Sequence, residues 1–366
     1  MSLFPARLAA LLLTLSFGSL AAPPPLPALN IDIRESSVSG ISSGAFMSTQ
    51  LQVAHSSIIK GAGIVAGGPY YCSQDDVVTA TTRCTCTGEP LLDCAVSSTS
   101  AAVPDLVSST RRVFERGLID DPANIARQRV ATISGGQDAL VPAPVTAQLH
   151  EYYHRMGLPA ENLTPVTVAQ AGHTMPTTAY GGQCGSTAEP FIGNCSFDSA
   201  SAMLSWIYGP DSAPARSDDK PGGRFIEFDQ RPYIPKGGFS SFLWGSGLDQ
   251  TGWLYVPERC ARGARCRLHV ALHGCKQGQS YLPLRPPTGG GLYYGTTFVR
   301  NTGYDRWADS NDLVVLFPQA VSIPGKNPNG CWDWWGYTDG HYADREGVQI
   351  RAIRAMMDRL SSGAKP

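Results

Sequence analysis

The sequence predicts an α/β protein with a largely parallel sheet, because segments typical of strands and helices alternate along it. Residues 31–39 alternate as a strand does, residues 40–44 (GISSG) form a tight turn, and residues 45–55 have the pattern of a helix. The apolar residues 58–66 follow as a buried strand, which the Gly-Gly-Pro at 67–69 stops. Such strand-helix-strand alternation is typical of parallel sheets.

The same pattern continues downstream. We expect further strands at residues 130–134, 165–169, 252–256, 268–272 and 313–317, and helices at 145–156 and 348–360. The last helix carries its apolar residues on one face and arginines on the other. Residues 71–105 lack periodicity and are expected as a disulfide-pinned loop or cap over the sheet edge, and residues 210–247 as a connector between two sheet-forming segments.

The first 22 residues predict a cleavable signal peptide. They contain Arg7, no acidic residue, a leucine-rich core and a small-residue ending. The apolar run 8–20 is shorter than the roughly 20 residues that a membrane-spanning helix needs. We therefore expect a secreted or periplasmic protein without a membrane span, in which residues 23–366 form a single catalytic domain.

Ten cysteines, an even number in a chain expected to be exported, predict disulfides and no metal site. Proximity in the sequence favours the pairs Cys184–Cys195 and Cys260–Cys266 and leaves the pairing of the other six open. Lys and Arg number 29 and Asp and Glu 30. This balance gives no electrostatic reason to expect nucleic acid or an anionic membrane as partner.

Ser42 is the candidate nucleophile. It is the serine of a Gly-x-Ser-x-Gly pattern between a predicted strand and a predicted helix, where a sharp turn exposes the hydroxyl and the helix N-terminus favours negative charge. The alternative is a merely glycine-rich turn. A serine esterase of the α/β-hydrolase kind also needs a histidine and a carboxylate, which follow the serine in the order acid, then histidine.

Asp138 and His173 satisfy that order, because each follows a predicted strand. Asp138 has an alternative role as a cap for the helix after Pro142. His273 and His341 compete with His173 as the catalytic base, but neither follows a strand in the expected order.

The oxyanion that forms during ester cleavage needs backbone donors. The Ser43 amide supplies the first, and the Cys275 amide is the candidate second donor because the His-Gly-Cys at 273–275 ends an apolar strand. The alternative is a simple strand-ending turn.

Residues 331–337 (CWDWWGY) hold four aromatics, beside a cysteine that can be tied to Cys275. Trp332, Trp334 and Trp335 are candidate walls of an apolar cleft, and a place in the core is an equal alternative.

The order of these motifs is unusual. The strand before His273 lies over two hundred residues after Ser42, whereas the oxyanion strand ordinarily precedes the nucleophile. The predicted C-terminal helix would then lead into the nucleophile strand. This indicates a circular permutation, with residues 210–247 as the join.

In combination, these motifs resemble the poly(3-hydroxybutyrate) depolymerases with a circularly permuted catalytic domain. The resemblance spans nearly the whole chain after residue 22 and is carried by six segments: VSGISSGAFM from Val38, AGIVAGGPYYC from Ala62, SGGQD from Ser134, AGH from Ala171, LHGC from Leu272 and GCWDWWG from Gly330.

The resemblance implies a Ser42, Asp138 and His173 triad, an oxyanion hole from the Ser43 and Cys275 amides, and polymer contact by tryptophans 332–335. It implies hydrolysis of a polyester or oligoester to short hydroxyacids through an acyl-enzyme, without a metal or organic cofactor, and we expect a monomer. The sequence shows no separate substrate-binding domain after Leu360, which favours amorphous polymer or soluble oligomers.

Two rival functions are also compatible with these motifs. A feruloyl or acetyl-xylan esterase would use the same triad with a different cleft. A non-catalytic polymer-binding protein would keep the fold and the aromatics.

Overall fold

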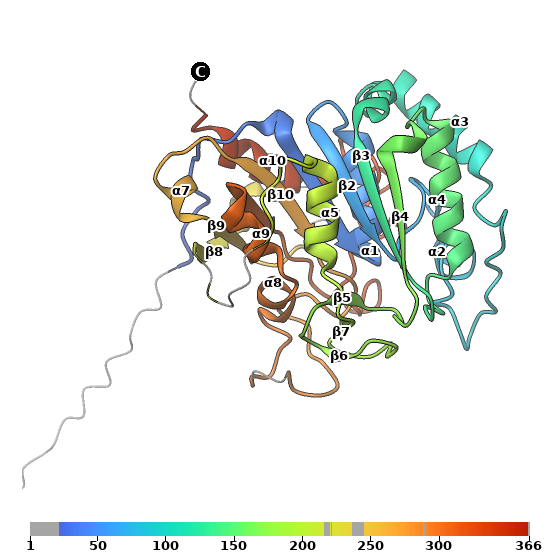
Figure 1. Ribbon diagram of the computed structural model, residues 1–366. Coiled ribbons are helices and arrows are strands. Elements are labelled where there is room, and N and C mark those ends of the chain that lie inside the picture. Colours follow the sequence, from blue (N-terminus) through green and yellow to red (C-terminus); the bar gives the residue numbers. More distant parts are fainter. Residues whose placement is uncertain (1–21, 216–219, 221, 236–244, 288–289, 365–366) are drawn as a thin grey trace, which may run out of the picture.

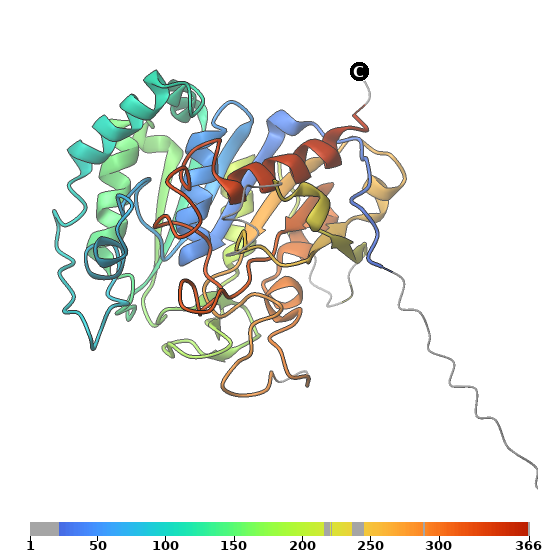
Figure 2. The same ribbon diagram turned by 180° about the vertical axis from the view of Figure 1, so that it is seen from behind.

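The computed structural model describes residues 22–215, 220, 222–235, 245–287 and 290–364. In these residues an eight-stranded sheet lies between two layers of helices, as the opposite views of Figures 1 and 2 show. The predicted signal peptide falls outside the described part except for Ala22. No helix within the described ranges combines the length and the hydropathy needed to cross a membrane.

The large sheet has the order β4-β3-β2-β1-β10-β11-β9-β8. From β4 to β11 each strand runs parallel to its neighbour, and β9 is antiparallel to both β11 and β8. The strands are β1 (Ser36–Ile41), β2 (Ile59–Val65), β3 (Arg129–Gly135), β4 (Leu163–Val168), β8 (Arg224–Asp229), β9 (Thr251–Val256), β10 (Arg267–Leu272) and β11 (Leu313–Phe317).

Helices cover both faces, so the central strands are buried, and β11 is entirely apolar, as is typical of parallel sheets. In β1, the buried Ser37 and Ser39 instead form hydrogen bonds with His269. One face packs against α1 (Ser43–Ala54), α4 (Ala143–Arg155) and α10 (Val348–Ser361), and α3 (Val103–Glu115) packs on α4. The other face packs against α5 (Ser199–Tyr208) and α9 (Tyr304–Ser310). Three short helices are α2 (Val77–Thr82), α7 (Glu258–Ala261) and α8 (Thr297–Asn301).

A small second sheet lies beyond the carboxyl ends of the large one (Figure 1). It has the order β5-β7-β6, with β5 at Met175–Thr177, β6 at Gly182–Gln183 and β7 at Ile192–Asn194. It follows β4 along the chain and lies on the same side of the large sheet as the loops after β3, β4 and β10.

Three sequence predictions need correction. The first strand begins at Ser36 and not at residue 31, because the Asp32 carboxylate accepts the Arg34 amide and starts a 3-10 turn at Ile33–Glu35. Residues 71–105 contain α2, which begins where the Asp76 carboxylate accepts the Val78 and Thr79 amides, and the start of α3.

Residues 210–247 are more than a connector, because β8 pairs along its whole length with β9. Residues 216–219, 221 and 236–244 of this segment lie outside the described part. The sequence prediction missed β8, since its glycine- and proline-rich surroundings hide one short strand.

All ten cysteines form disulfides. Cys184–Cys195 and Cys260–Cys266 pair as predicted, and Cys275 pairs with Cys331. The remaining pairs, Cys72–Cys84 and Cys86–Cys94, lie within residues 71–105, so the prediction of a disulfide-pinned region is confirmed.

The sheet also accounts for the unusual order of motifs. β1 and β10, more than two hundred residues apart in sequence, are neighbouring parallel strands, with Ser37 opposite His269. The Leu29 amide donates to the Leu360 carbonyl at 2.8 Å, so the end of α10 lies beside the segment that enters β1. This adjacency is what a circular permutation requires.

Candidate active site

Ser42 occupies a sharp turn between β1 and α1. Its φ of 57° and ψ of −123° are rare for a residue with a side chain. A Cβ on Gly44 would lie 2.4 Å from the carbonyl oxygens of Leu272 and His273, and one on Gly40 would lie 2.4 Å from the Gly44 oxygen. Glycine is therefore required on both sides of the serine, which explains the Gly-x-Ser-x-Gly spacing sterically.

Asp138 and His173 lie on loops after β3 and β4, and both side chains are buried. His173 Nδ1 and Asp138 Oδ2 are 2.8 Å apart, while Asp138 Oδ1 accepts the amides of Leu140 and Val141 at 2.8 and 2.9 Å. The carboxylate is thus fixed by its own loop and orients the imidazole. Its alternative role as a helix cap is not observed, because the N-cap of α4 is Pro142 and makes no side-chain cap bond.

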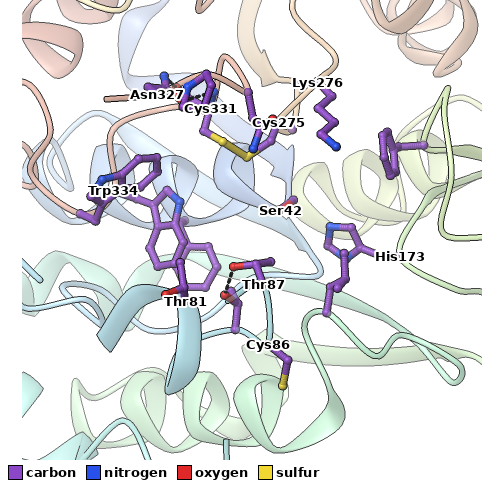
Figure 3. Close-up of a pocket in the computed structure, with 18 of the residues that line it drawn as sticks. Ser42, Thr81, Cys86, Thr87, His173, Cys275, Lys276, Asn327, Cys331 and Trp334 are labelled. Atoms are coloured by element: carbon purple, nitrogen blue, oxygen red, sulfur yellow. Dashed lines mark hydrogen bonds between the residues drawn. A yellow bond between two sulfur atoms is a disulfide. The ribbon is translucent and has the colours of Figure 1, made fainter. Parts of the chain in front are cut away.

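Ser42 and His173 line one cavity of about 700 Å³ (Figure 3). Because Nδ1 faces Asp138, Nε2 of His173 is the nitrogen available to a nucleophile. Within the described residues Ser42 makes no side-chain hydrogen bond. Nucleophile-base contacts in an unliganded active site are often long and shorten when substrate binds.

The loop after β10 reaches Ser42. A Cβ on Gly274 would lie 3.3 Å from the Ser42 Cβ, so this backbone passes close beside the serine. Cys275 lines the cavity next to it. Ser43 is the first residue of α1, where an amide has no partner inside the helix. The two predicted oxyanion donors thus belong to segments that meet at Ser42.

Gln277 fixes the loop that carries Cys275. Its buried side chain accepts the Gly274 amide at 2.7 Å and donates to the carbonyls of Pro190 and Phe191 at 3.1 Å each. Sequence analysis missed this residue. A glutamine shortly after the His-Gly-Cys segment was its only signal.

The competing histidines have other roles. His273 is fully buried, with Nδ1 2.7 Å from the Gly274 carbonyl and Nε2 accepting the Ala320 amide at 3.1 Å. Burial lowers the pKa of His273 to about 4. His341 pairs with Asp344 at 2.9 Å, and this hydrogen bond raises the pKa of His341. Neither lines the cavity.

The tryptophans divide between wall and core. Trp334 and Trp335 line the cavity, and Trp334 stacks on Phe46 with ring centroids 4.1 Å apart. Trp332 is 0% exposed and packs 5.4 Å from the His273 ring, so the expectation that it contacts substrate is wrong. Its backbone amide instead donates to Ser43 Oγ at 3.3 Å and ties this segment to the nucleophile turn.

Asp333 organises the aromatic segment. Its buried carboxylate accepts the amides of Trp335, Gly336, Tyr337 and Thr338 and the Thr338 hydroxyl. Burial raises the pKa of Asp333 to about 6. One side chain thus folds the backbone around itself and presents Trp334 and Trp335 to the cavity.

The rest of the lining is mainly apolar. Ile41, Phe46, Val77, Leu140 and Phe191 face the space together with the two tryptophans. The Cys275–Cys331 disulfide joins the loop after β10 to the aromatic segment on the same rim (Figure 3). The arrangement suits an ester with an aliphatic body.

No protein-family model matches the chain. A polyhydroxybutyrate depolymerase of Talaromyces funiculosus is 35% identical over 353 residues, which cover 92% of this chain and 93% of that protein. The chain belongs to the poly(3-hydroxybutyrate) depolymerase family. The resemblance noted from its motifs is therefore confirmed.

Other members of the depolymerase family agree. A poly(3-hydroxybutyrate) depolymerase of Delftia acidovorans is 41% identical over 351 residues, covering 94% of this chain but 63% of that protein. The chain thus spans less than two thirds of the length of this relative. The crystal structure of a PHB depolymerase from Penicillium funiculosum superposes with a TM-score of 0.78 at 32% identity, over 93% of this chain and all of that one.

A second depolymerase structure, a serine-to-alanine variant complexed with a 3-hydroxybutyrate trimer, gives a TM-score of 0.77 at 32% identity over the same shares of the two chains. These likenesses confirm the predicted α/β-hydrolase fold.

Proposed function

We propose that this chain hydrolyses the ester bonds of poly(3-hydroxybutyrate) or of its oligomers and releases short hydroxyacids through an acyl-enzyme. One observation carries the proposal: the conformationally strained Ser42 lines the same apolar cavity as His173, which is paired with the buried Asp138. The trimer complex of the depolymerase variant supports the substrate class.

The first half of the reaction acylates Ser42. Its Oγ attacks the ester carbonyl carbon while His173 Nε2 accepts the hydroxyl proton, and Asp138 stabilises the imidazolium through its 2.8 Å contact with Nδ1. The amides of Ser43 and Cys275 donate to the oxyanion. The carbon–oxygen bond to the leaving alcohol then breaks, and His173 returns its proton to that oxygen.

The second half reverses these roles with water. His173 takes a proton from a water molecule, the hydroxide attacks the acyl carbon, and the proton passes to Ser42 Oγ as the hydroxyacid departs. Trp334, Trp335 and Phe46 form an apolar wall that holds the aliphatic chain while this occurs.

The test measures product release from amorphous poly(3-hydroxybutyrate), with a short-chain nitrophenyl ester and a feruloyl ester alongside. Ser42→Ala is expected to lose at least about 1,000-fold in kcat on every cleaved substrate. Ser108→Ala, an exposed serine on α3, is the matched control and keeps full activity.

If the small esters are cleaved but no hydroxybutyrate oligomers are released from the polymer, the proposed triad stands and the polymer assignment fails. Feruloyl ester cleavage alone would favour the feruloyl esterase alternative. Polymer binding without any hydrolysis would favour a non-catalytic protein.

We also propose export after cleavage of residues 1–22, a single catalytic domain from residue 23 onward with the permutation join near residues 210–247, and a monomeric state. The five disulfides support an oxidising destination. N-terminal sequencing of the secreted protein and its mass in solution test these points.

A further inference from the structure

Lys276 directs a positive charge into the cavity. Its backbone amide donates to the Asn329 carbonyl at 2.7 Å, and its half-buried side chain lines the cavity. In Figure 3 the amino group points into this space, toward His173. In the described ranges the amino group has neither an ion-pair nor a hydrogen-bond partner.

The backbone at Lys276 is unusual as well. Its φ of 63° lies in the left-handed region, which glycine adopts without cost and other residues adopt at a cost of about 1 kcal/mol or more. Strained backbone of this kind gathers at functional sites. A lysine in a position suited to glycine indicates that its side chain has a use there.

Among the described residues, no acidic side chain forms an ion pair with this ammonium group. Most of the lining is apolar, and the other charged residues that line the cavity, Glu89 and Lys326, are exposed. A partly desolvated ammonium group is stabilised when an anion meets it. The cavity is therefore suited to a substrate that carries one negative charge on an otherwise uncharged aliphatic body.

A polyester of hydroxyacids carries such a charge at one place only, the carboxylate at its end. In the cleavage reaction the leaving alcohol belongs to the part of the chain that ends in this carboxylate, and His173 protonates that alcohol. A short aliphatic spacer separates the alcohol oxygen from the carboxylate within the last hydroxybutyrate unit. In Figure 3, Lys276 and His173 lie on the same side of Ser42. A leaving unit that His173 protonates would therefore lie within reach of Lys276.

We propose that Lys276 binds the free carboxylate of the terminal hydroxyacid unit, so that the chain prefers the ester bond next to the carboxyl end of short oligomers. This inference rests on the proposed function and specifies which ester bond is cleaved and from which end of the oligomer. Lys276 is a specificity-determining residue in this scheme and takes no part in the chemical steps.

The test uses the linear dimer of 3-hydroxybutyrate, which contains a single ester bond, as the free acid and as its terminal N-methylamide. kcat/KM for both is measured with the parent protein, Lys276→Met, Lys276→Arg, Lys326→Met and Lys60→Met. Lys60 lies on β2, is absent from the cavity lining and serves as the control.

The parent is expected to cleave the acid about tenfold more efficiently than the amide, which corresponds to about 1.4 kcal/mol. Lys276→Met removes this preference by slowing cleavage of the acid alone, while Lys276→Arg and Lys60→Met keep it. Salt weakens the preference in the parent and leaves cleavage of the amide unchanged.

Equal cleavage of acid and amide by the parent overturns the proposal, as does a preference that persists in Lys276→Met or disappears in Lys326→Met alone. Cleavage of the ester bond in the N-methylamide dimer, which lacks the carboxylate, measures the proposed function separately. If the parent releases hydroxyacids from amorphous polymer but cleaves neither dimer, the role of Lys276 fails and the proposed function stands. If it hydrolyses the nitrophenyl ester but neither the polymer nor the dimers, the substrate assignment fails as well.

Discussion

Gln277 provides the sharpest test of how the oxyanion loop is held; this is the loop after β10 that carries the Cys275 amide, the proposed second oxyanion donor. Methionine at this position keeps the length and the apolar stem of the side chain but removes its amide group. The Gly274 amide then loses its acceptor, whereas the Pro190 and Phe191 carbonyls keep other donors, the Tyr294 hydroxyl and the Met175 amide. Gln277→Met therefore leaves one buried backbone group unsatisfied and removes three hydrogen bonds.

The magnitude follows from that count. Three hydrogen bonds contribute about 1 kcal/mol each, so the free energy of unfolding should fall by about 3 kcal/mol. Loss of an oxyanion donor lowers kcat by about 100- to 1,000-fold in serine hydrolases. A loosened loop that only misplaces the Cys275 amide should lose part of that, about 10- to 100-fold, with KM little changed.

Gln279 offers a matched control two positions along the chain. Its side chain also makes three hydrogen bonds, one from the Trp253 indole and two to Thr251, but it does not line the cavity. Gln279→Met should lose comparable stability and keep kcat. Nitrophenyl ester kinetics and urea unfolding on both variants separate the two effects.

Suppose that Gln277→Met loses stability but keeps kcat within about twofold of the parent. The reasoning would then be refuted, because the position of the Cys275 amide would not depend on the hydrogen bonds of Gln277. Equal losses of kcat in both glutamine variants would also refute it, since a general loss of stability would then explain the data.

Three further predictions follow from single features. Gly44→Ala places a Cβ 2.4 Å from two backbone carbonyl oxygens and should reduce ester hydrolysis by at least about 100-fold, whereas Gly340→Ala meets nothing within 4 Å and should match the parent. Burial lowers the pKa of His269 to about 3 from its usual 6.5, so between these pH values the unfolded chain binds a proton that the folded chain excludes. The contribution of neutral His269 to the free energy of unfolding is complete above pH 6.5 and is lost as the pH falls toward 3, by about 1.4 kcal/mol per pH unit. Thermal melts should show this fall in stability, and it should be less steep in His269→Gln. Asp333→Ala releases the backbone that carries the tryptophans, so KM for a hydroxybutyrate oligomer should rise about tenfold while kcat on a nitrophenyl ester stays within about threefold of the parent.

Much of the fold could be predicted because its signals are local. The strand, turn and helix around Ser42 follow from alternation and glycine spacing, and β11 matches its predicted range residue for residue. The helix α5 was missed, because its small residues Ser199 to Ala202 give a weak apolar pattern. The edge strand β8 was missed because only pairing with β9 defines it.

Within the site, the sequence could not predict the direction in which each side chain points. Trp332 and Trp334 stand two positions apart in an irregular loop, where no period tells which one faces the core. The roles of Asp333 and Gln277 rest on hydrogen bonds to backbone groups, some of them on distant loops. Such contacts exist only once the chain has folded.

The Cys275–Cys331 disulfide spans 56 residues, the longest separation among the five, and joins the oxyanion loop to the aromatic segment. The side chains of Ser42 and His173 contain no sulfur, so reduction of this disulfide leaves both chemically intact. It acts on the two segments that the disulfide joins. Reduction should therefore loosen the loop that carries the Cys275 amide as well as the segment that carries Trp334 and Trp335, so kcat and the fit of the ester should fall together. An oxidising environment should therefore be needed for the working geometry of the site as well as for the stability of the fold.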